Sequence, residues 1–266
     1  MRIRGRVVLR WGLGGLLSAL FLVGVGFVVW ASTPLGPADA ALAALASDET
    51  VTVLQDRWIT FEPATDATTG LVLYPGGRVD PRSYAPLARA IAARGHLVVI
   101  VPMPLNLAVF APGRATDAIT AHPAITIWAV GGHSLGGAMA ARYAYLDIGT
   151  IDGLVLWAAY PASTDDLSNR QHLAALSVHA TLDGLINAQE RLGSKALLPA
   201  HTCWVPIEGG NHAQFGDYGA QRGDYPAAIP QAEQHAAIVD ATASFLARLE
   251  IANSGASIDC AQIGGK

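Results

Sequence analysis

Residues 131–137 read Gly-Gly-His-Ser-Leu-Gly-Gly and narrow the possible folds more than any other part of the chain. An apolar run typical of a buried strand precedes them, and small residues typical of a helix follow. A strand that turns directly into a helix strains the backbone at the turn, where neighbouring side chains would clash. We therefore expect Ser134 at this turn, between Gly132 and Gly136, with its hydroxyl presented at the carboxyl end of the strand.

Strand and helix patterns alternate on both sides of this turn. The run at 97–101 is apolar throughout, as expected of a parallel strand that helices cover on both faces. The alternation predicts an α/β fold with a doubly wound, mostly parallel sheet. Strands are predicted at 51–55, 58–61, 71–74, 97–101, 125–130, 153–159, 174–180 and 202–207, and helices between 80 and 95 and at 114–121, 135–145, 185–192 and 231–249.

Ser134 needs a base and an acid to act as a nucleophile, because the pKa of a serine hydroxyl lies far above neutral. Of the eight histidines, His212 lies in a glycine-rich loop after the last predicted strand. In parallel α/β sheets, the active site is formed by such loops at the carboxyl ends of the strands. His133 shares the tight turn with Ser134, so we do not expect its ring to reach the hydroxyl as a base must. The sequence therefore predicts that His212 is the base.

Asp183 is the predicted acid because it follows the strand at 174–180, again at a carboxyl end. Its alternative role is to cap the helix that follows. Other carboxylates remain open as the acid, the first two after the preceding strand and the third, a weaker candidate, close to His212 in sequence: Asp165, Asp166 and Asp217.

Four segments give residues 50–250 a resemblance to the α/β-hydrolase superfamily, and in particular to its small serine members similar to dienelactone hydrolases and esterases. The order serine, aspartate, histidine along the chain is also the order of that superfamily. The segments are GGHSLGG at 131–137, YPGG at 74–77, T-x-D-G around Asp183 and GGNHAQFGDYG at 209–219.

The resemblance implies a serine triad and an oxyanion hole made by two backbone N–H groups. The first is that of Leu135, at the start of the helix after the turn. By the resemblance, the second comes from Gly77 or Arg78 in the loop after the third strand. Dienelactone hydrolases themselves carry a cysteine where this chain has Ser134, so their substrate is not implied.

The predicted site has little room for a lid. Only thirteen residues separate Tyr160 from the strand at 174–180, whereas capped lipases insert several dozen. We therefore expect an α/β-hydrolase-type fold without a large cap and an open site for short or exposed acyl groups. Four aromatic residues in nearby loops are candidates for lining the site, with ordinary packing as the alternative: Phe110, Tyr160, Phe215 and Tyr218.

Residues 11–30 form an uncharged run that, at about 1.5 Å per residue, spans about 30 Å of hydrocarbon. Four arginines precede this run, so the positive-inside rule places the rest of the chain across the membrane. The sequence predicts one transmembrane helix in contact with the lipid bilayer and a catalytic domain outside the cytoplasm. The alternative is a signal segment cleaved near residues 38–40, which leaves a secreted protein.

These patterns divide the chain into four parts. A basic flank and anchor (1–33) and a linker with a short helix (34–50) precede the α/β-hydrolase domain (51–250), and a tail (251–266) follows. Charged residues make up only 14% of the chain and the net charge is −4, so no nucleic-acid partner is expected.

Cys203 and Cys260 are the two cysteines, and neither has neighbours at metal-ligand spacing. We therefore expect no metal and no cofactor. In an oxidising compartment the two can form a disulfide worth about 4 kcal/mol by chain entropy. Two separate buried thiols are the alternative.

Two functional hypotheses follow. The first is a serine hydrolase in which Ser134 attacks an ester or related acyl bond of a small molecule, His212 transfers the proton, Asp183 orients the imidazole and water cleaves the acyl-enzyme. The second is a non-catalytic protein of the same fold that binds a ligand or partner outside the membrane.

Overall fold

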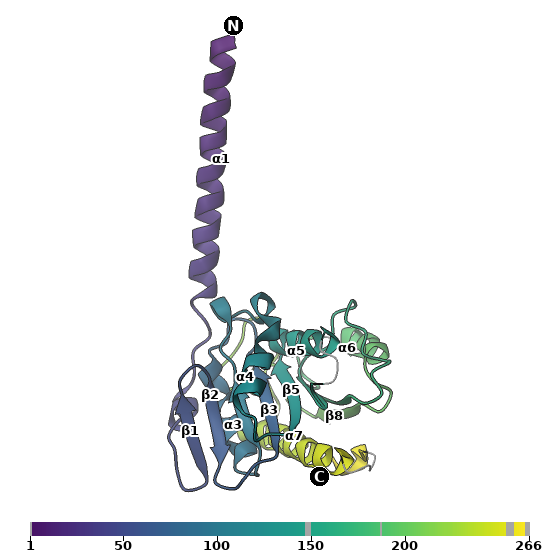
Figure 1. The fold of residues 1–266 in the computed structure, drawn as a ribbon. Helices are drawn as coiled ribbons and strands as arrows, with labels where there is room; N and C mark the ends of the chain where they lie inside the picture. The colour runs from purple at the N-terminus through teal and green to yellow at the C-terminus, as the bar shows by residue number, and fades with distance from the viewer. Residues whose placement is uncertain (1, 147–149, 187, 254–257, 264–266) are drawn as a thin grey trace.

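A single sheet of eight strands organises the molecule (Figure 1), with the order β1-β2-β4-β3-β5-β6-β7-β8. The computed structural model describes residues 2–146, 150–186, 188–253 and 258–263, and it describes only the backbone of residues 2–15 and 253. All neighbouring strands from β4 to β8 pair in parallel, whereas β2 is antiparallel to both β1 and β4. The predicted mostly parallel sheet is confirmed. Its strands are β1 (Val51–Gln55), β2 (Ile59–Pro63), β3 (Thr69–Tyr74), β4 (Leu97–Ile100), β5 (Ile127–His133), β6 (Gly153–Trp157), β7 (Ala174–Ala180) and β8 (Cys203–Ile207).

Helices cover both faces of the sheet, as the doubly wound prediction requires. Leu97 and Val99 of β4 pack into one apolar core, and Val98 and Ile100 pack into the other. This alternation buries the strand completely because successive side chains point to opposite faces. The first core includes α4 (Ala115–Ala121) and α5 (Leu135–Leu146), and the second includes α3 (Ala85–Ala92) and α7 (Gln231–Asn253).

The remaining helices are short. Two are α-helices, α2 (Asp39–Ala43) and α6 (Ala188–Ser194). The others are 3₁₀ turns at Pro81–Tyr84, Pro104–Asn106, Ala108–Phe110, Pro112–Arg114, Lys195–Leu197, Ala213–Phe215 and Cys260–Gln262.

Two predicted elements differ from their expected bounds for a clear local reason. The strand predicted at 153–159 ends at Trp157, because Ala158 has a φ of +41°, which no strand residue adopts. The helix predicted at 185–192 begins only at Ala188. The preceding N–H groups of Leu185 and Ile186 donate instead to the carboxylate of Asp183.

The N-terminal segment is helical, and α1 (Arg2–Ala31) leads away from the body of the molecule (Figure 1). Within the described part of the chain, however, no helix has both the length and the apolar character needed to cross a membrane. The transmembrane helix and the bilayer contact predicted for residues 11–30 are therefore not supported. The side chains at the start of this segment, Trp11 included, lie outside the described residues.

Both segments that flank residues 51–250 pack on the body. Ala41 in the expected linker region is fully buried, and Leu35 forms a bridge with Val79. In the tail, a disulfide joins Cys260 to Cys203 with a Cα–Cα distance of 5.2 Å. It closes a loop with a sequence separation of 57 residues, which in the chain-entropy model stabilises the fold by about 4 kcal/mol.

Candidate active site

Ser134 stands on the sharp turn between β5 and α5. Its φ of +52° lies in the left-handed region that a serine rarely adopts, which is the strained backbone the sequence predicts. A Cβ on Gly132 would come within 2.5 Å of the Gly136 backbone, and one on Gly136 would collide with the carbonyl oxygen of Tyr74. The turn therefore requires both glycines, and it fixes the serine at the carboxyl end of the central strand.

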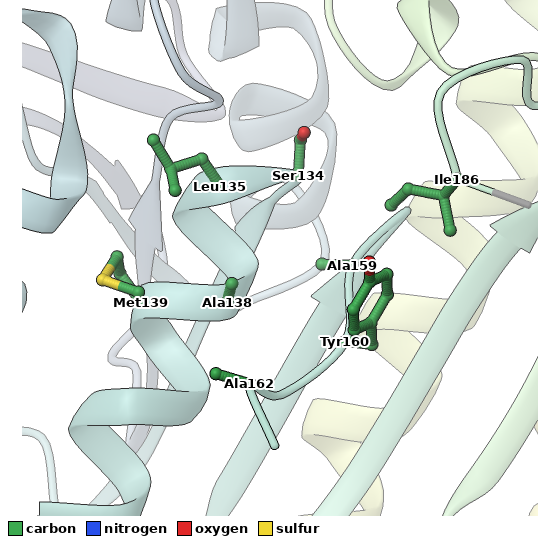
Figure 2. Close-up of a pocket in the computed structure, with 8 residues that line it drawn as sticks. All are labelled: Ser134, Leu135, Ala138, Met139, Ala159, Tyr160, Ala162 and Ile186. Carbon is green, nitrogen blue, oxygen red and sulfur yellow. The ribbon is translucent and has the colours of Figure 1, made fainter. Parts of the chain in front are cut away.

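A cavity of about 420 Å³ opens beside Ser134 (Figure 2). Of the four aromatic residues predicted to line the site, only Tyr160 lines this cavity. Sequence reasoning missed Met139 and Ile186, which come from a helix and from a loop beyond β7. The lining is mainly apolar and consists of Ser134, Leu135, Ala138, Met139, Ala159, Tyr160, Ala162 and Ile186.

The other three predicted aromatic residues pack elsewhere. Phe110 is exposed and meets the ring of Phe27 edge-on at 6.2 Å. Phe215 is fully buried, and Tyr218 is buried with its hydroxyl donating to Gln221. The rings of Phe215 and Tyr218 gain more from burial in the core than from lining an open cavity, so their place in the loop of His212 did not bring them to the cavity.

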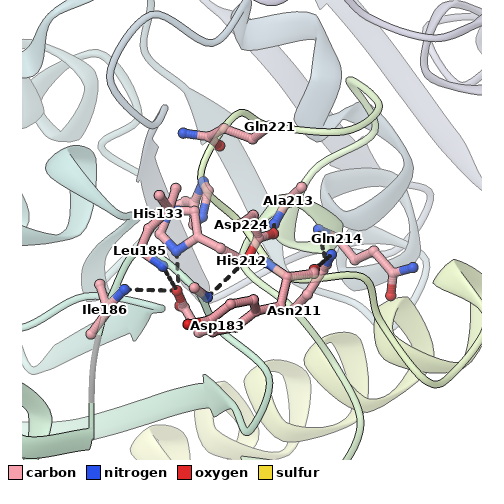
Figure 3. Close-up of polar contacts among 12 residues, drawn as sticks. His133, Asp183, Leu185, Ile186, Asn211, His212, Ala213, Gln214, Gln221 and Asp224 are labelled. Carbon is pink, nitrogen blue, oxygen red and sulfur yellow. Dashed lines mark hydrogen bonds and ion pairs between the residues drawn. The ribbon is translucent and has the colours of Figure 1, made fainter.

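The structure brings Asp183 and His212 together, although 29 residues separate them in sequence. His212 Nδ1 and Asp183 Oδ2 lie 2.8 Å apart, and both side chains are almost entirely buried (Figure 3). The other carboxylate oxygen, Oδ1, accepts the N–H groups of Leu185 and Ile186, each at 2.8 Å. One oxygen of Asp183 therefore holds the turn before α6, while the other orients the imidazole.

The second ring nitrogen of His212 is free to accept a proton. Because Asp183 is an acceptor, Nδ1 carries the hydrogen in this pair and Nε2 carries the lone pair. Nε2 is buried and has no hydrogen-bond partner among the described residues, Ser134 included. Hydrogen bonds between a nucleophile and its base often tighten only when substrate binds. The arrangement provides an oriented, unoccupied proton acceptor.

Asp224 joins the loops that carry the acid and the base, a role that sequence reasoning missed. Its Oδ1 accepts the N–H of Gly184 at 2.9 Å and its Oδ2 accepts the N–H of Ala213 at 2.8 Å (Figure 3). Gln234 of α7 supports the same base loop, because its side-chain amide makes hydrogen bonds of 2.9 and 2.8 Å with the backbone N–H and C=O of Asn211. These contacts fix the loop of His212 relative to the loop of Asp183.

His133 packs against the ring of His212, but its hydrogen-bond partner is Tyr84. Its ring centroid lies 4.5 Å from that of His212, and its Nδ1 lies 2.9 Å from the hydroxyl of Tyr84. That hydroxyl also accepts the N–H of Gly76 at 2.8 Å, so it connects His133 to the loop after β3. Complete burial lowers the pKa of His133 well below its usual value. His133 is therefore a neutral link between the serine turn and the loop after β3, and not a base for Ser134.

The loop after β3 lies against the start of α5, where an oxyanion hole is expected. A Cβ on Gly77 would lie 3.1 Å from the side chain of Leu135, so Gly77 packs against the first residue of α5. The N–H of Arg78 already donates to the carbonyl oxygen of Asn106 at 2.8 Å. Of the two residues that the resemblance offered as second donor, Gly77 is the one whose N–H has no hydrogen bond among those described.

The alternative acids have partners of their own. Asp165 is buried in an ion pair with Arg142, Asp166 accepts the N–H of Ser168, and Asp217 accepts the side-chain amide of Gln231. Among the residues that the structure describes, Asp183 is the carboxylate that meets His212. The described side chains also contain no group of three or more His, Cys, Asp or Glu residues that could hold a metal ion.

Comparisons with known proteins agree with this architecture. The model of the alpha/beta hydrolase family matches residues 70–236, which is more than half of the chain. None of the curated proteins matches the sequence at a significant level. Among solved structures, Est1E from Butyrivibrio proteoclasticus is 10% identical over 76% of this chain and 99% of its own, with a TM-score of 0.51.

Two further solved structures are similar over nearly their whole length. The predicted CIB-like hydrolase from Thermoplasma acidophilum is 13% identical over 73% of this chain and 99% of its own, with a TM-score of 0.54. The sugar hydrolase YeeB from Lactococcus lactis is 16% identical over 77% of this chain and 98% of its own, with a TM-score of 0.51. At these identities the likeness is one of fold.

Proposed function

Because the chain belongs to the alpha/beta hydrolase family, we propose that it is a serine hydrolase that cleaves an ester or related acyl bond of a small molecule. The observation that carries this proposal is the buried hydrogen bond of 2.8 Å between His212 and Asp183. A strained serine turn supports it, because the backbone strain at Ser134 serves to present a nucleophile. No metal or cofactor enters the proposed chemistry.

In the proposed mechanism, Ser134 Oγ attacks the acyl carbon while His212 Nε2 takes its proton. The carboxylate of Asp183 stabilises the imidazolium that forms and keeps the ring in the tautomer with hydrogen on Nδ1. The backbone N–H groups of Leu135 and Gly77 stabilise the oxyanion. His212 then protonates the leaving group, and a water molecule cleaves the acyl-enzyme by the same steps in reverse order.

The cavity indicates a short acyl group. Its lining is mostly apolar and includes Met139 of α5 and Ile186 of the loop beyond β7. The connection between β6 and β7, residues 158–173, is too short to form a large cap. The site therefore suits small or exposed acyl groups better than long lipid chains.

A series of p-nitrophenyl esters from acetyl to palmitoyl tests this substrate class. We expect kcat/KM to be highest for short acyl groups and to fall for long ones. Replacing Met139 with alanine should move the optimum to longer chains, because the truncated side chain enlarges the cavity. The matched control is Met103→Ala, since Met103 is buried in the core and does not line this cavity. An optimum at long chains in the unmodified protein, or no shift in Met139→Ala, would contradict the assignment of the cavity.

We also propose that the catalytic body works outside the reducing cytoplasm. The disulfide between Cys203 and Cys260 supports this, because structural disulfides persist in oxidising compartments. Alkylation of free thiols during recovery from the native compartment, followed by mass spectrometry without reductant, should yield the cross-linked peptides. Two alkylated cysteines would contradict the proposed location.

A further inference from the structure

We propose that the segment at residues 30–35, here called the N-terminal clamp, positions the oxyanion loop at residues 76–80, and that Arg78 is the residue through which it acts. The inference rests on the proposed hydrolase function, because it assigns the clamp a part in stabilising the oxyanion. It adds a positioning role for a segment that lies before the matched family region at 70–236.

The side chain of Arg78 grips the clamp from the loop side. Its Nε donates to the carbonyl oxygen of Trp30 at 2.8 Å, and its Nη2 donates to that of Thr33 at 2.6 Å. The guanidinium also lies over the ring of Trp30, 4.3 Å from the centroid. All these partners lie in the clamp, so the planar guanidinium with its several donors holds two carbonyl groups and an aromatic ring at once.

The backbones of the two segments are joined as well. Leu35 donates its N–H to the carbonyl oxygen of Arg78 at 2.7 Å, and its own carbonyl oxygen accepts the N–H of Asp80 at 2.9 Å. Asn106 contacts both the clamp and the oxyanion loop. Its side-chain amide donates to the carbonyl oxygen of Ala31 at 2.9 Å, while its carbonyl oxygen accepts the N–H of Arg78 at 2.8 Å.

These contacts stabilise a backbone conformation that is unfavourable on its own. Arg78 has a φ of +57°, a left-handed conformation that is uncommon for a residue with a side chain and persists where the surroundings fix it. The residue directly before it is Gly77, the candidate second donor to the oxyanion. Oxyanion stabilisation depends on donors held in place before the reaction, so loosening Arg78 should displace the N–H of Gly77.

Arg222 offers a matched control on the same surface. A cavity of about 330 Å³ between the clamp and the loop is lined by Trp30, Gly77, Arg78 and Arg222, among others. Arg222 is exposed, and none of the hydrogen bonds or ion pairs described between the clamp and the loop involves it. Replacing either arginine with glutamine removes one positive charge from this cavity, but only Arg78→Gln breaks the clamp.

The test compares the full-length protein with its Arg78→Gln and Arg222→Gln variants on a short p-nitrophenyl ester. For Arg78→Gln we expect kcat to fall by about 10- to 100-fold, less than the roughly 10²- to 10³-fold loss for removal of an oxyanion donor, because the donor is displaced and not removed, while KM changes less than about twofold. Affinity for a trifluoromethyl ketone, which forms a tetrahedral oxyanion on the serine, should fall by a similar factor. Arg222→Gln should match the unmodified protein. Arg78→Lys keeps the positive charge but loses the planar guanidinium, so its kcat and ketone affinity should lie between those of Arg78→Gln and Arg222→Gln.

The outcomes separate this inference from the proposed function. If the unmodified protein hydrolyses the ester and Arg78→Gln has the same kcat and ketone affinity, the clamp has no positioning role and the hydrolase assignment stands. A change in KM alone would also overturn the inference, as would equal losses in Arg78→Gln and Arg222→Gln. If the Arg78→Gln melting temperature shows that it is unfolded, Arg78→Lys decides by the same measurements. If the unmodified protein hydrolyses no ester, both the inference about the clamp and the hydrolase assignment are overturned.

Discussion

Replacing Ser134 with alanine lowers kcat for ester hydrolysis by a factor of about 10³ to 10⁶, because the nucleophile is lost and only the remaining groups of the site act on the substrate. The fold should persist, since alanine fits the space of the serine and Gly132 and Gly136 still permit the turn. The measurement is kcat on a short p-nitrophenyl ester, together with the melting temperature.

Ser83→Ala is the matched control for this substitution. Ser83 is fully buried, and its hydroxyl has no hydrogen-bond partner among the described residues, so removing it breaks no recorded contact. We expect normal turnover from this variant. A folded Ser134→Ala variant that keeps normal turnover would exclude Ser134 as the nucleophile.

Replacing Asp183 with asparagine lowers kcat by about 10⁴-fold, by analogy with the loss of the orienting carboxylate in other serine triads. The two side chains have nearly the same volume, and an amide oxygen can still accept the N–H groups of Leu185 and Ile186. The amide nitrogen that then faces His212 is a donor, so it favours the tautomer with hydrogen on Nε2. That tautomer cannot take a proton from Ser134 at this nitrogen.

Asp166→Asn is the matched control for the acid. Asp166 is one of the alternative acids from the sequence, and in the structure its carboxylate accepts the N–H of Ser168. Hydrogen bonds from the side chain and from the backbone of Ser168 lower the pKa of the Asp166 carboxyl, so the variant changes an ionised group that does not meet His212. Normal turnover in Asp183→Asn, beside an inactive but folded Asp165→Asn or Asp166→Asn variant, would move the acid to the strand before β7.

The serine turn could be predicted from sequence because the residues that mark it lie together in one short motif. Gly132 makes room for the Gly136 backbone within the motif, Gly136 makes room for the backbone at the end of β3, and the apolar strand and small-residue helix adjoin both glycines. The base and the acid could be placed for a related reason. Loops at the carboxyl ends of parallel strands meet at one edge of the sheet, so His212 and Asp183 converge across a long sequence separation.

Contacts made by loops with one another could not be predicted in this way. Asp224 joins the loops of Asp183 and His212 by accepting backbone N–H groups. Every residue except proline has such a group, so the sequence does not indicate which ones Asp224 contacts. Prolines and a glycine after residue 32 indicate a linker, yet this stretch carries Leu35, which is joined to the oxyanion loop. The decisive partner there is Arg78, whose side chain would be expected in solvent unless the fold were known.

The most direct test of a reactive serine at this site is the mass of the protein after treatment with a fluorophosphonate, followed by peptide mapping. The account predicts one phosphonyl adduct per chain, located on Ser134, and no adduct on Ser134→Ala, because only a serine activated by His212 and held opposite Leu135 and Gly77 displaces the fluoride. A folded protein that hydrolyses no ester and takes up no label, or one labelled at another residue, would contradict it.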